Sequence, residues 1–145
     1  MSDRQVEILL IEDNPRDAEL TMRAFRKRHL ANRVVHVEDG QAALDFLFCE
    51  GPYAQRGEAH PQVVLLDLKL PKVDGIEVLR RIRGDQRLKV LPVVVLTSSR
   101  EESDIIKAYH LGVNSYIVKP VEFENFSEAV SNLGFYWLLL NQPPL

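Results

Sequence analysis

The sequence feature that most constrains the fold is an apolar run, Val63 to Leu66, that leads directly into Asp67. A continuous apolar run of this length that ends in a turn signal is typical of a strand buried on both faces, and Pro71 provides the signal. In open α/β sheets, ligands bind in the crevice outside the carboxyl ends of the strands. An ionised carboxylate beside a buried strand is unfavourable unless a cation binds it. We therefore expect Asp67 to share this crevice with a cationic group.

Strand and helix patterns alternate five times, which predicts a parallel sheet with helices on both faces. The expected strands cover residues 6–11, 33–38, 63–66, 92–96 and 115–118. The first helix is expected over residues 15–29, and the others begin after Asp39-Gly40, at Asp74-Gly75, before Ile105 and near Glu122. Residues 50–61 are rich in Gly, Pro and charged residues and are expected to form a surface loop.

The composition excludes several classes of protein. The chain has 145 residues, enough for one domain, and its 46% hydrophobic and 27% charged residues are ordinary for a soluble globular protein. A net charge of −3 gives no reason to expect a nucleic acid or a membrane surface as a partner. The single cysteine, Cys49, excludes an internal disulfide. Since the sequence also has no signal peptide or membrane-spanning run, we expect a cytoplasmic protein.

Polar side chains follow four of the expected strands: Glu12 and Asp13, Asp67, Thr97, and Lys119. Because the carboxyl ends of parallel strands open on one edge, these groups are expected to share a crevice. Three carboxylates this close raise one another's pKa, and Mg²⁺, which binds carboxylates together with waters and phosphate oxygens, relieves the repulsion. The Lys119 ammonium suits a phosphoryl group. The set therefore predicts phosphoryl transfer with Asp67 as the nucleophile.

The pattern resembles the receiver domain of two-component response regulators (CheY-like proteins), and its elements are Glu12-Asp13, Asp67, Pro71, Asp74-Gly75, Thr97 and Lys119-Pro120. The resemblance covers about residues 5–130 and implies an α/β, flavodoxin-like, doubly wound sheet of five parallel strands in the order 2-1-3-4-5. It also implies that Asp67 accepts a phosphoryl group from the phosphohistidine of a sensor histidine kinase. Such a protein catalyses only its own phosphorylation and dephosphorylation, so we do not expect a true enzyme.

The resemblance also assigns the ligands of a divalent cation, which is the expected cofactor. Asp13, Asp67 and the backbone carbonyl of Lys69 would bind Mg²⁺ (or Mn²⁺) directly. Glu12 would act through a metal-bound water. In many family members the first acidic residue is Asp, but Glu is common at this position, so the pattern of the chain agrees with the family.

By the same resemblance, Thr97, Lys119 and Tyr116 carry the response to phosphorylation. A phosphoryl group would draw in Thr97 and Lys119, because it adds negative charge and acceptor oxygens. Tyr116 matches the aromatic switch residue of the family and would rotate into the space that Thr97 leaves; the alternative is an ordinary core aromatic residue. The face formed by the fourth helix, the fifth strand and the fifth helix would then change shape and signal to a partner protein.

Several other residues have an expected role or two open interpretations. Lys69 and Ser99, two positions beyond Asp67 and Thr97, match positions that tune dephosphorylation in the family, or are ordinary exposed loop residues. Cys49 is expected to be a small buried hydrophobic residue. A basic group is expected to form a solvated helix face: Arg80, Arg81, Arg83, Arg87 and Lys89.

The C-terminal segment, residues 133–140, is apolar on all sides, which is more than a helix packed on one sheet face needs. Large exposed apolar patches mark interfaces, so we expect a homodimer, with intramolecular packing as the alternative. The expected organisation is a receiver domain at residues 5–130 and a C-terminal helical extension at residues 131–145 that contacts a dimer mate or a partner. With the loop at 50–61, this tail resembles the stand-alone receivers that partner phytochrome-type kinases. The output would be a protein contact, for example with a histidine phosphotransfer protein.

Other functions fit the same sequence less well. Haloacid dehalogenase-type phosphatases also use an Asp nucleophile, but they need a second Asp where Lys69 stands. A flavodoxin-like FMN carrier would need a Ser/Thr/Gly-rich phosphate loop in place of Glu12-Asp13-Asn14-Pro15. A receiver-like interaction module that is never phosphorylated is the remaining alternative, and incubation with acetyl phosphate and Mg²⁺ distinguishes it.

Overall fold

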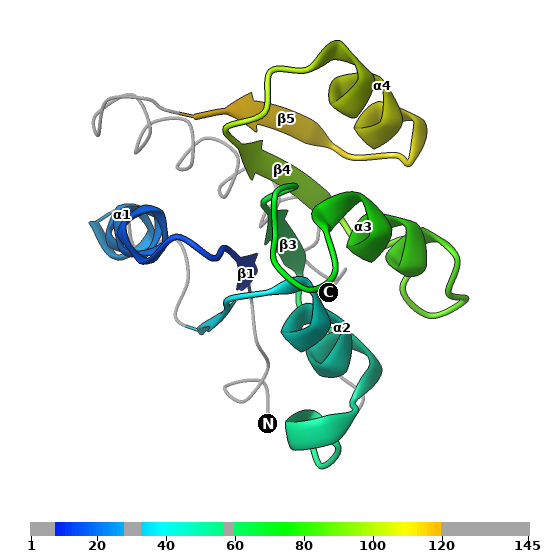
Figure 1. Ribbon diagram of the computed structural model, residues 1–145. Helices are drawn as coiled ribbons and strands as arrows, with labels where there is room; N and C mark the ends of the chain where they lie inside the picture. The colour runs from blue at the N-terminus through cyan, green and yellow to red at the C-terminus, as the bar shows by residue number, and fades with distance from the viewer. Residues whose placement is uncertain (1–7, 28–32, 57–59, 120–145) are drawn as a thin grey trace, which may run out of the picture.

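The computed structural model describes residues 8–27, 33–56 and 60–119. They form a five-stranded parallel sheet in the order β2-β1-β3-β4-β5, which confirms the flavodoxin-like doubly wound fold that the sequence predicts (Figure 1). The strands are β1 (Ile8–Ile11), β2 (Val34–Val37), β3 (Val63–Leu66), β4 (Val93–Thr97) and β5 (Ser115–Val118). The described helices are α1 (Pro15–Lys27), α2 (Gly40–Phe48), α3 (Gly75–Arg83) and α4 (Glu102–His110), with a short 3₁₀ helix, η2 (Gly51–Tyr53), after α2.

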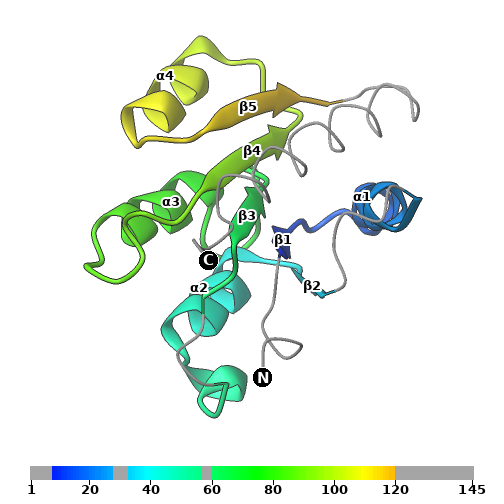
Figure 2. The same cartoon turned by 180° about the vertical axis from the view of Figure 1, so that it is seen from behind.

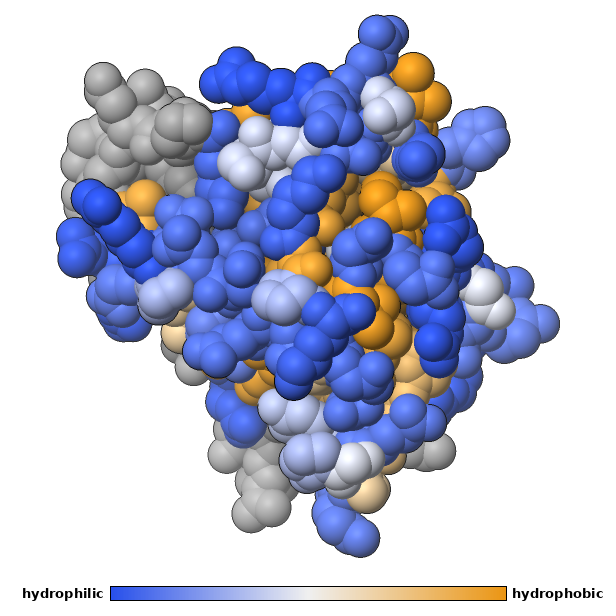
Figure 3. All heavy atoms as spheres, viewed as in Figure 1, coloured by the Kyte–Doolittle hydropathy of each residue, from blue (hydrophilic) through white to orange (hydrophobic). Residues whose placement is uncertain are grey.

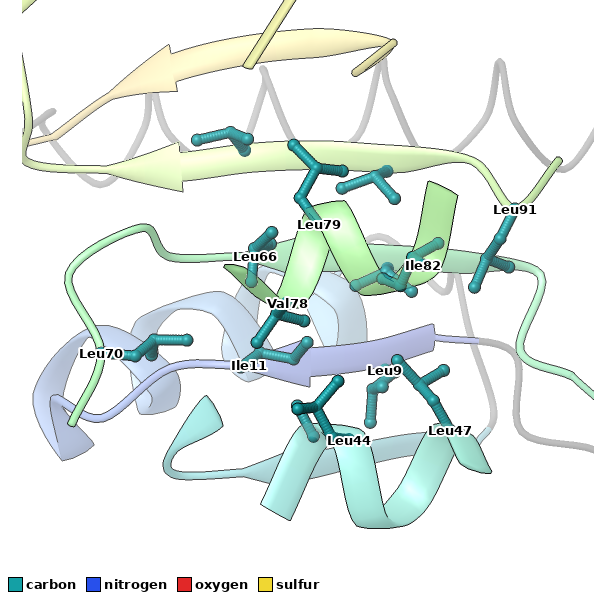
Figure 4. Packing of buried hydrophobic residues seen from close by; sticks show 14 of the residues in the cluster. Leu9, Ile11, Leu44, Leu47, Leu66, Leu70, Val78, Leu79, Ile82 and Leu91 are labelled. Atoms are coloured by element: carbon teal, nitrogen blue, oxygen red, sulfur yellow. The ribbon is translucent and has the colours of Figure 1, made fainter. Parts of the chain in front are cut away.

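The two faces of the sheet bury different side chains, because successive strand residues point to opposite faces. Helices α2, α3 and α4 cover one face, and α1 covers the other (Figure 1, Figure 2). On the first face, Leu9, Ile11 and Leu66 of the strands pack with Leu44 of α2 and Leu79 of α3 (Figure 4). Every residue of β1, β3 and β4 is buried, which confirms that these apolar runs are strands buried on both sides.

The register of the sheet brings the strand ends to one edge. Ile11 of β1 pairs with Leu66 of β3, and Leu66 pairs with Val95 of β4. Thr97 of β4 pairs with Val118 of β5. The residues that follow these positions in the chain therefore emerge next to one another, which is the arrangement that a shared crevice requires.

Gly75, the first residue of α3, packs against the backbone that carries Asp67. A Cβ atom at this position would overlap the Asp67 carbonyl oxygen and the Leu68 Cα, which are both backbone atoms. The Gly75 N–H donates a hydrogen bond to the Leu68 carbonyl at 2.8 Å. Beside it, the Asp74 carboxylate caps α3 by accepting a hydrogen bond from the Glu77 N–H at 3.1 Å. Glycine is therefore required where α3 closes onto the end of β3.

Arg83 does not belong to the solvated basic face, and that expectation is wrong for this residue. Its guanidinium donates hydrogen bonds to the carbonyl oxygens of Lys89 at 3.1 Å, Leu91 at 2.8 Å, Leu111 at 2.7 Å and Gly112 at 2.9 Å. Burial lowers the pKa of Arg83 from its ordinary value, but a guanidinium stays charged in proteins and donates in several directions. The side chain ties the end of α4 to the loop before β4. The other four basic residues of the group are exposed.

Cys49 differs from the sequence expectation, whereas the described part of the loop at 50–61 is mostly exposed, as predicted. Cys49 is only partly buried, and it ends α2 in the left-handed conformation with φ 56°. The loop at 50–61 contains η2, and the ring of Tyr53 packs edge-on against Phe46 with 5.1 Å between the ring centroids. The Arg56 guanidinium lies 4.2 Å from the centroid of the same ring. The described part of this loop thus packs against α2.

Some expectations fall on residues outside those that the structure describes. They are the last helix near Glu122, the C-terminal extension at 131–145, and the outer ends of the first strand and the first helix. Among the helices that are described, none is long and apolar enough to cross a membrane.

Candidate functional site

The carboxyl edge of the sheet gathers three acidic side chains. One carboxylate oxygen from each of Glu12, Asp13 and Asp67 lies within 4.8 Å of the other two. Glu12 and Asp13 follow β1, and Asp67 follows β3, its neighbour in the sheet. Glu12 and Asp67 are buried, at 1% and 5% exposure, whereas Asp13 is exposed. The crevice therefore concentrates carboxylates inside the protein and opens to solvent at Asp13.

Both carboxylate oxygens of Asp67 have neighbours from other parts of the sheet edge. Oδ1 accepts hydrogen bonds from Thr97 Oγ1 at 2.8 Å and from the Lys69 backbone N–H at 3.1 Å. Oδ2 lies 3.5 Å from Lys119 Nζ. Because Thr97 is fully buried, water does not compete for this hydrogen bond, and the hydroxyl holds the Asp67 carboxylate in place.

Lys119 supplies the cation that the sequence predicts beside Asp67, but two other carboxylates bind it more closely. Its Nζ donates hydrogen bonds to Asp17 Oδ2 at 2.7 Å and to Glu12 Oε1 at 2.9 Å. Burial alone would lower the pKa of Lys119, but the hydrogen bonds to Asp17 and Glu12 together raise it above the ordinary value. The ammonium therefore stays charged at physiological pH.

Glu12 has a strongly shifted pKa. Burial raises the pKa of Glu12 from 4.5 to about 7, and the hydrogen bond from Lys119 limits the rise. Its Oε2 accepts a hydrogen bond from the Asn14 N–H at 3.2 Å, and its backbone carbonyl oxygen lies 2.7 Å from His36 Nε2. Glu12 is thus expected to titrate near neutral pH unless a nearby cation stabilises its charged form.

The donor set of this crevice fits a hard divalent cation. Three carboxylates, those of Glu12, Asp17 and Asp67, contact the Lys119 ammonium, and Asp13 adds a fourth beside them, so negative charge is in excess. Mg²⁺ and Mn²⁺ prefer carboxylate and carbonyl oxygens as ligands. The arrangement can therefore hold a divalent ion beside a carboxylate that also contacts an ammonium and a hydroxyl.

Comparison with known proteins identifies this arrangement. The model of the response regulator receiver domain matches residues 8–131 of the chain. The chain belongs to this family. The resemblance that the sequence indicates is thereby confirmed, and an acidic cluster such as Glu12, Asp13 and Asp67 is typical of the divalent metal site of receiver domains.

Three relatives show which receivers the chain resembles. The chain is 47% identical over 138 residues to the probable methanogenesis regulatory protein FilR2 of Methanothrix harundinacea. The matched region covers 94% of this chain and 86% of FilR2. The solved structure of the phosphorylated cyanobacterial phytochrome response regulator RcpA has a TM-score of 0.86 and 40% identity, covering 97% of this chain and 99% of that chain. The Mn²⁺-bound form of response regulator Rcp1 has a TM-score of 0.85 and 36% identity with the same coverage. Rcp1 is a protein of Synechocystis sp..

In this receiver, Asp104 of α4 joins the loops that leave β3 and β4. Ser99 Oγ donates a hydrogen bond to Asp104 Oδ2 at 2.6 Å, and Lys69 Nζ lies 3.2 Å from the same oxygen. The hydrogen bond from Ser99 lowers the pKa of Asp104, and the hydrogen bond to Asp104 raises the pKa of Lys69. Ser99 is buried, so its interpretation as an exposed loop residue is wrong, whereas Lys69 is exposed.

Tyr116 of β5 is half-buried beside the loop between β4 and α4. Its hydroxyl donates a hydrogen bond to the Ser99 carbonyl at 3.1 Å. Its ring centroid lies 6.5 Å from that of Tyr109 on α4, and the rings are tilted by 31°. Burial raises the pKa of the Tyr116 hydroxyl. The side chain thus contacts both α4 and the loop, and its role as a switch stays a prediction.

Reasoning from the sequence missed Asp17 and Asp104. Asp17 lies in the first turn of α1, which begins three residues after Glu12, and this closeness to the end of β1 is a signal that would have found it. Asp104 lies in the first turn of α4, but its partners come from two separate loops. No spacing in the sequence indicates contacts of that kind.

Proposed function

We propose that this receiver accepts a phosphoryl group on Asp67 from the phosphohistidine of a sensor histidine kinase, with Mg²⁺ (or Mn²⁺) bound. The observation that carries the proposal is the Asp67 carboxylate, which lies 3.5 Å from the Lys119 ammonium and close to two further acidic side chains. A carboxylate oxygen of Asp67 forms a bond to phosphorus while the bond between phosphorus and the histidine nitrogen breaks, and the histidine ring, which carries a proton on its other nitrogen, leaves as neutral imidazole. In this reaction the receiver itself is the molecule that accepts the phosphoryl group.

The proposed metal ligands are Asp13, Asp67 and the Lys69 carbonyl, with Glu12 acting through a water. When bound, the divalent ion supplies positive charge that offsets the charge of the carboxylates and of the incoming phosphoryl group. Asp13 is exposed and marks the open side of the crevice. Glu12 is buried and holds the Lys119 ammonium at 2.9 Å, so it also positions the group that neutralises Asp67.

Phosphorylation would change the contacts on the β4 and β5 side of Asp67. Thr97 Oγ1, which lies 2.8 Å from Asp67 Oδ1, would donate to a phosphoryl oxygen instead, and the Lys119 ammonium would bind a second one. Tyr116 would then move into the space that Thr97 leaves. The hydrogen bond from Tyr116 to the Ser99 carbonyl supports this coupling, because the ring and the loop between β4 and α4 have to move together.

The proposed signalling surface is formed by α4 and β5 together with the helix expected after them, which lies outside the described residues. Ile106 and Tyr109 of α4 are apolar or aromatic residues with 57% and 52% exposure. Figure 3 shows hydrophobic atoms at α4 and between α4 and α3, on a face that is otherwise mostly polar. An apolar contact surface next to the switch residue supports a partner protein as the recipient of the signal.

Incubation with acetyl phosphate and Mg²⁺, followed by intact mass measurement, tests the phosphorylation of Asp67. We expect the wild-type protein to gain the mass of one phosphoryl group and Asp67→Asn to gain none. Asp45→Asn, which changes a partly exposed carboxylate on α2, is the matched control and should gain the group as the wild type does. A wild-type protein that gains no phosphoryl group would instead support an interaction module that acts without phosphorylation.

The affinity for Mg²⁺ is expected to depend on pH through Glu12. Burial raises the pKa of Glu12 to about 7, so below this pH the carboxyl is mostly protonated and no longer attracts the cation. Because the proton must leave before the charged site forms, we expect binding about tenfold weaker at pH 6 than at pH 8. Isothermal titration calorimetry at both values measures this ratio, and Glu12→Gln should remove most of it. Equal affinities of the wild-type protein at the two pH values would contradict the prediction.

We further propose a phytochrome-type kinase as the partner and a homodimer as the assembled form. RcpA, a phytochrome response regulator by name, is 40% identical and covers 97% of this chain, which supports the first proposal. The dimer proposal rests on the apolar segment 133–140, which lies outside the described residues. Size-exclusion chromatography with light scattering should give the mass of a dimer for the wild type and of a monomer for Trp137→Glu. A monomeric wild-type protein would rule the dimer out.

A further inference from the structure

Asp104 is a buried carboxylate that the proposed phosphorylation of Asp67 does not use. It is 8% exposed and lies in the first turn of α4. A buried carboxylate is unfavourable unless it is paired and hydrogen-bonded, and Asp104 meets this requirement with partners from two other segments. Its Oδ2 accepts the 2.6 Å hydrogen bond from Ser99 Oγ and contacts Lys69 Nζ at 3.2 Å. Three segments of the chain thus converge on one oxygen atom.

Both partners of Asp104 are attached to the residues that bind the phosphoryl group in the proposed reaction. The Lys69 backbone N–H donates to Asp67 Oδ1 at 3.1 Å, and the Ser99 backbone N–H donates to Thr97 Oγ1 at 3.3 Å. The side chains of Lys69 and Ser99 therefore branch from backbone that directly contacts the site of phosphorylation. The Lys69 ammonium sits on a flexible four-carbon stem. A phosphoryl group on Asp67 would be a strong competitor for it, since it carries nearly two negative charges.

We propose that Asp104 is a positioning residue for the phosphorylated site, because it holds the Lys69 ammonium and the Ser99 hydroxyl away from the phosphoryl group on Asp67. The proposal rests on the proposed function, namely that Asp67 is phosphorylated. Lys69 is 56% exposed at its side chain and has no buried stem to fix it, so the ion pair with Asp104 determines where its ammonium lies. The hydrogen bond from Ser99 in turn fixes the Asp104 carboxylate.

The consequence concerns the lifetime of the aspartyl phosphate. In hydrolysis, a water oxygen forms a bond to phosphorus, the bond between phosphorus and the Asp67 oxygen breaks, and Asp67 leaves as a carboxylate. The protons of the water remain on the inorganic phosphate or pass to solvent. An ammonium released from Asp104 would bind the phosphoryl oxygens from the solvent side, stabilise their charge and obstruct the approach of water. Asp104 therefore keeps the phosphorylated state short-lived.

The time course of phosphoryl loss, measured by intact mass after removal of acetyl phosphate in the presence of Mg²⁺, tests this role. We expect Asp104→Asn to accept the phosphoryl group and to keep it about fivefold longer than the wild type. This is the size of effect expected from one additional, partly exposed ion pair between the Lys69 ammonium and the phosphoryl oxygens. Lys69→Gln combined with Asp104→Asn should restore the wild-type lifetime, because no ammonium is left to release. Glu101→Gln removes a neighbouring exposed carboxylate that acts on Lys69 through its charge, whereas Asp104 holds the ammonium directly, and this control should leave the lifetime unchanged.

Each of the other outcomes would overturn the proposal. A lifetime of Asp104→Asn that is equal to or shorter than that of the wild type shows that Asp104 does not hold Lys69 off the phosphoryl group. A long lifetime that persists in the double variant shows that Lys69 is not the group that Asp104 controls. Lys69→Gln alone keeps the backbone carbonyl proposed as a metal ligand and changes only an exposed side chain, so it should fold and bind the ion; a changed lifetime in this variant would show that the Lys69 ammonium already reaches the phosphoryl group. Failure of the proposed function is distinct, because the wild type would then gain no mass at all.

Discussion

Lys119→Met is expected to lower the free energy of unfolding by about 3 kcal/mol at pH 8, in the presence of a metal chelator. The substitution removes the ammonium that lies between Asp17, Glu12 and Asp67, at 2.7, 2.9 and 3.5 Å. The Met side chain fills much of the space of the Lys stem, so little cavity remains. The loss arises because Glu12 and Asp67 are buried carboxylates that lose the cation which compensates them in the wild-type protein.

The loss caused by Lys119→Met should be smaller at pH 6. The pKa of Glu12 is raised from 4.5 to about 7 in the folded protein, so the folded state binds the proton more tightly than the unfolded chain does. The stability that this carboxyl contributes is therefore complete below pH 4.5 and is lost as the pH rises through 7. In the wild-type protein Lys119 lowers the pKa of Glu12, so its removal raises this pKa further and the loss of stability continues to higher pH. The stability difference between Lys119→Met and the wild type should therefore be about 1 kcal/mol larger at pH 8 than at pH 6.

Urea denaturation of both proteins at pH 6 and pH 8 measures these differences. Lys89→Met is the matched control, because the Lys89 side chain is exposed, and it should change stability by less than about 0.5 kcal/mol. A Lys119→Met protein as stable as the wild type at pH 8 would show that the three carboxylates repel little in the folded state. The account of the crevice as a site of excess negative charge would then be wrong.

Gly75→Ala is expected to lower the free energy of unfolding by about 2 kcal/mol, which corresponds to a urea midpoint roughly 1 M lower. Replacing Gly with Ala within a helix normally stabilises by about 0.5–1 kcal/mol. Here the added methyl group would overlap the Asp67 carbonyl oxygen and the Leu68 Cα, and backbone atoms of a buried strand end cannot turn aside. The steric term therefore exceeds the gain in helix propensity, and the chain that carries Asp67 has to shift.

Gly84→Ala provides the matched control at the other end of α3. A Cβ atom there would meet the Arg80 carbonyl at 3.4 Å, an ordinary contact, and the backbone has φ −86°. We expect this variant to be as stable as the wild type or slightly more stable. If the two variants lost the same stability, the close approach of Gly75 to the Asp67 backbone would not be the cause. A Gly75→Ala protein of full stability but slow phosphorylation would show that the displacement is confined to Asp67.

The parts of the fold and site that follow from a repeating pattern could be predicted from the sequence. The apolar runs give strands β1, β3 and β4, and a parallel sheet necessarily brings Asp67 and Lys119 to the same edge. The order of polar residues at the strand ends was sufficient to indicate the receiver family. These inferences need only the period of the strands and the direction of the chain, which the sequence contains.

The contacts that the sequence did not reveal all depend on how the helices and loops lie relative to one another in the folded chain. Asp17 takes the closest position to Lys119, and Asp104 joins two loops through Ser99. Arg83 looked like one more exposed basic residue, but its guanidinium reaches four carbonyl oxygens. Cys49 ends α2 in the left-handed conformation, which is uncommon for a residue other than Gly. Such contacts are set by tertiary geometry and leave no periodic signal.

The four hydrogen bonds of Arg83 determine which end of α4 is free to respond. They fasten the C-terminal end of α4, at Leu111 and Gly112, to the loop before β4. The N-terminal end depends instead on Asp104 and its contacts with loops that border Asp67. If Asp67 is phosphorylated as proposed, we expect the C-terminal end of α4 to stay in place while its first turn moves. A small rearrangement around Asp67 would become a swing of the first turn of α4, and the helix as a whole would not slide.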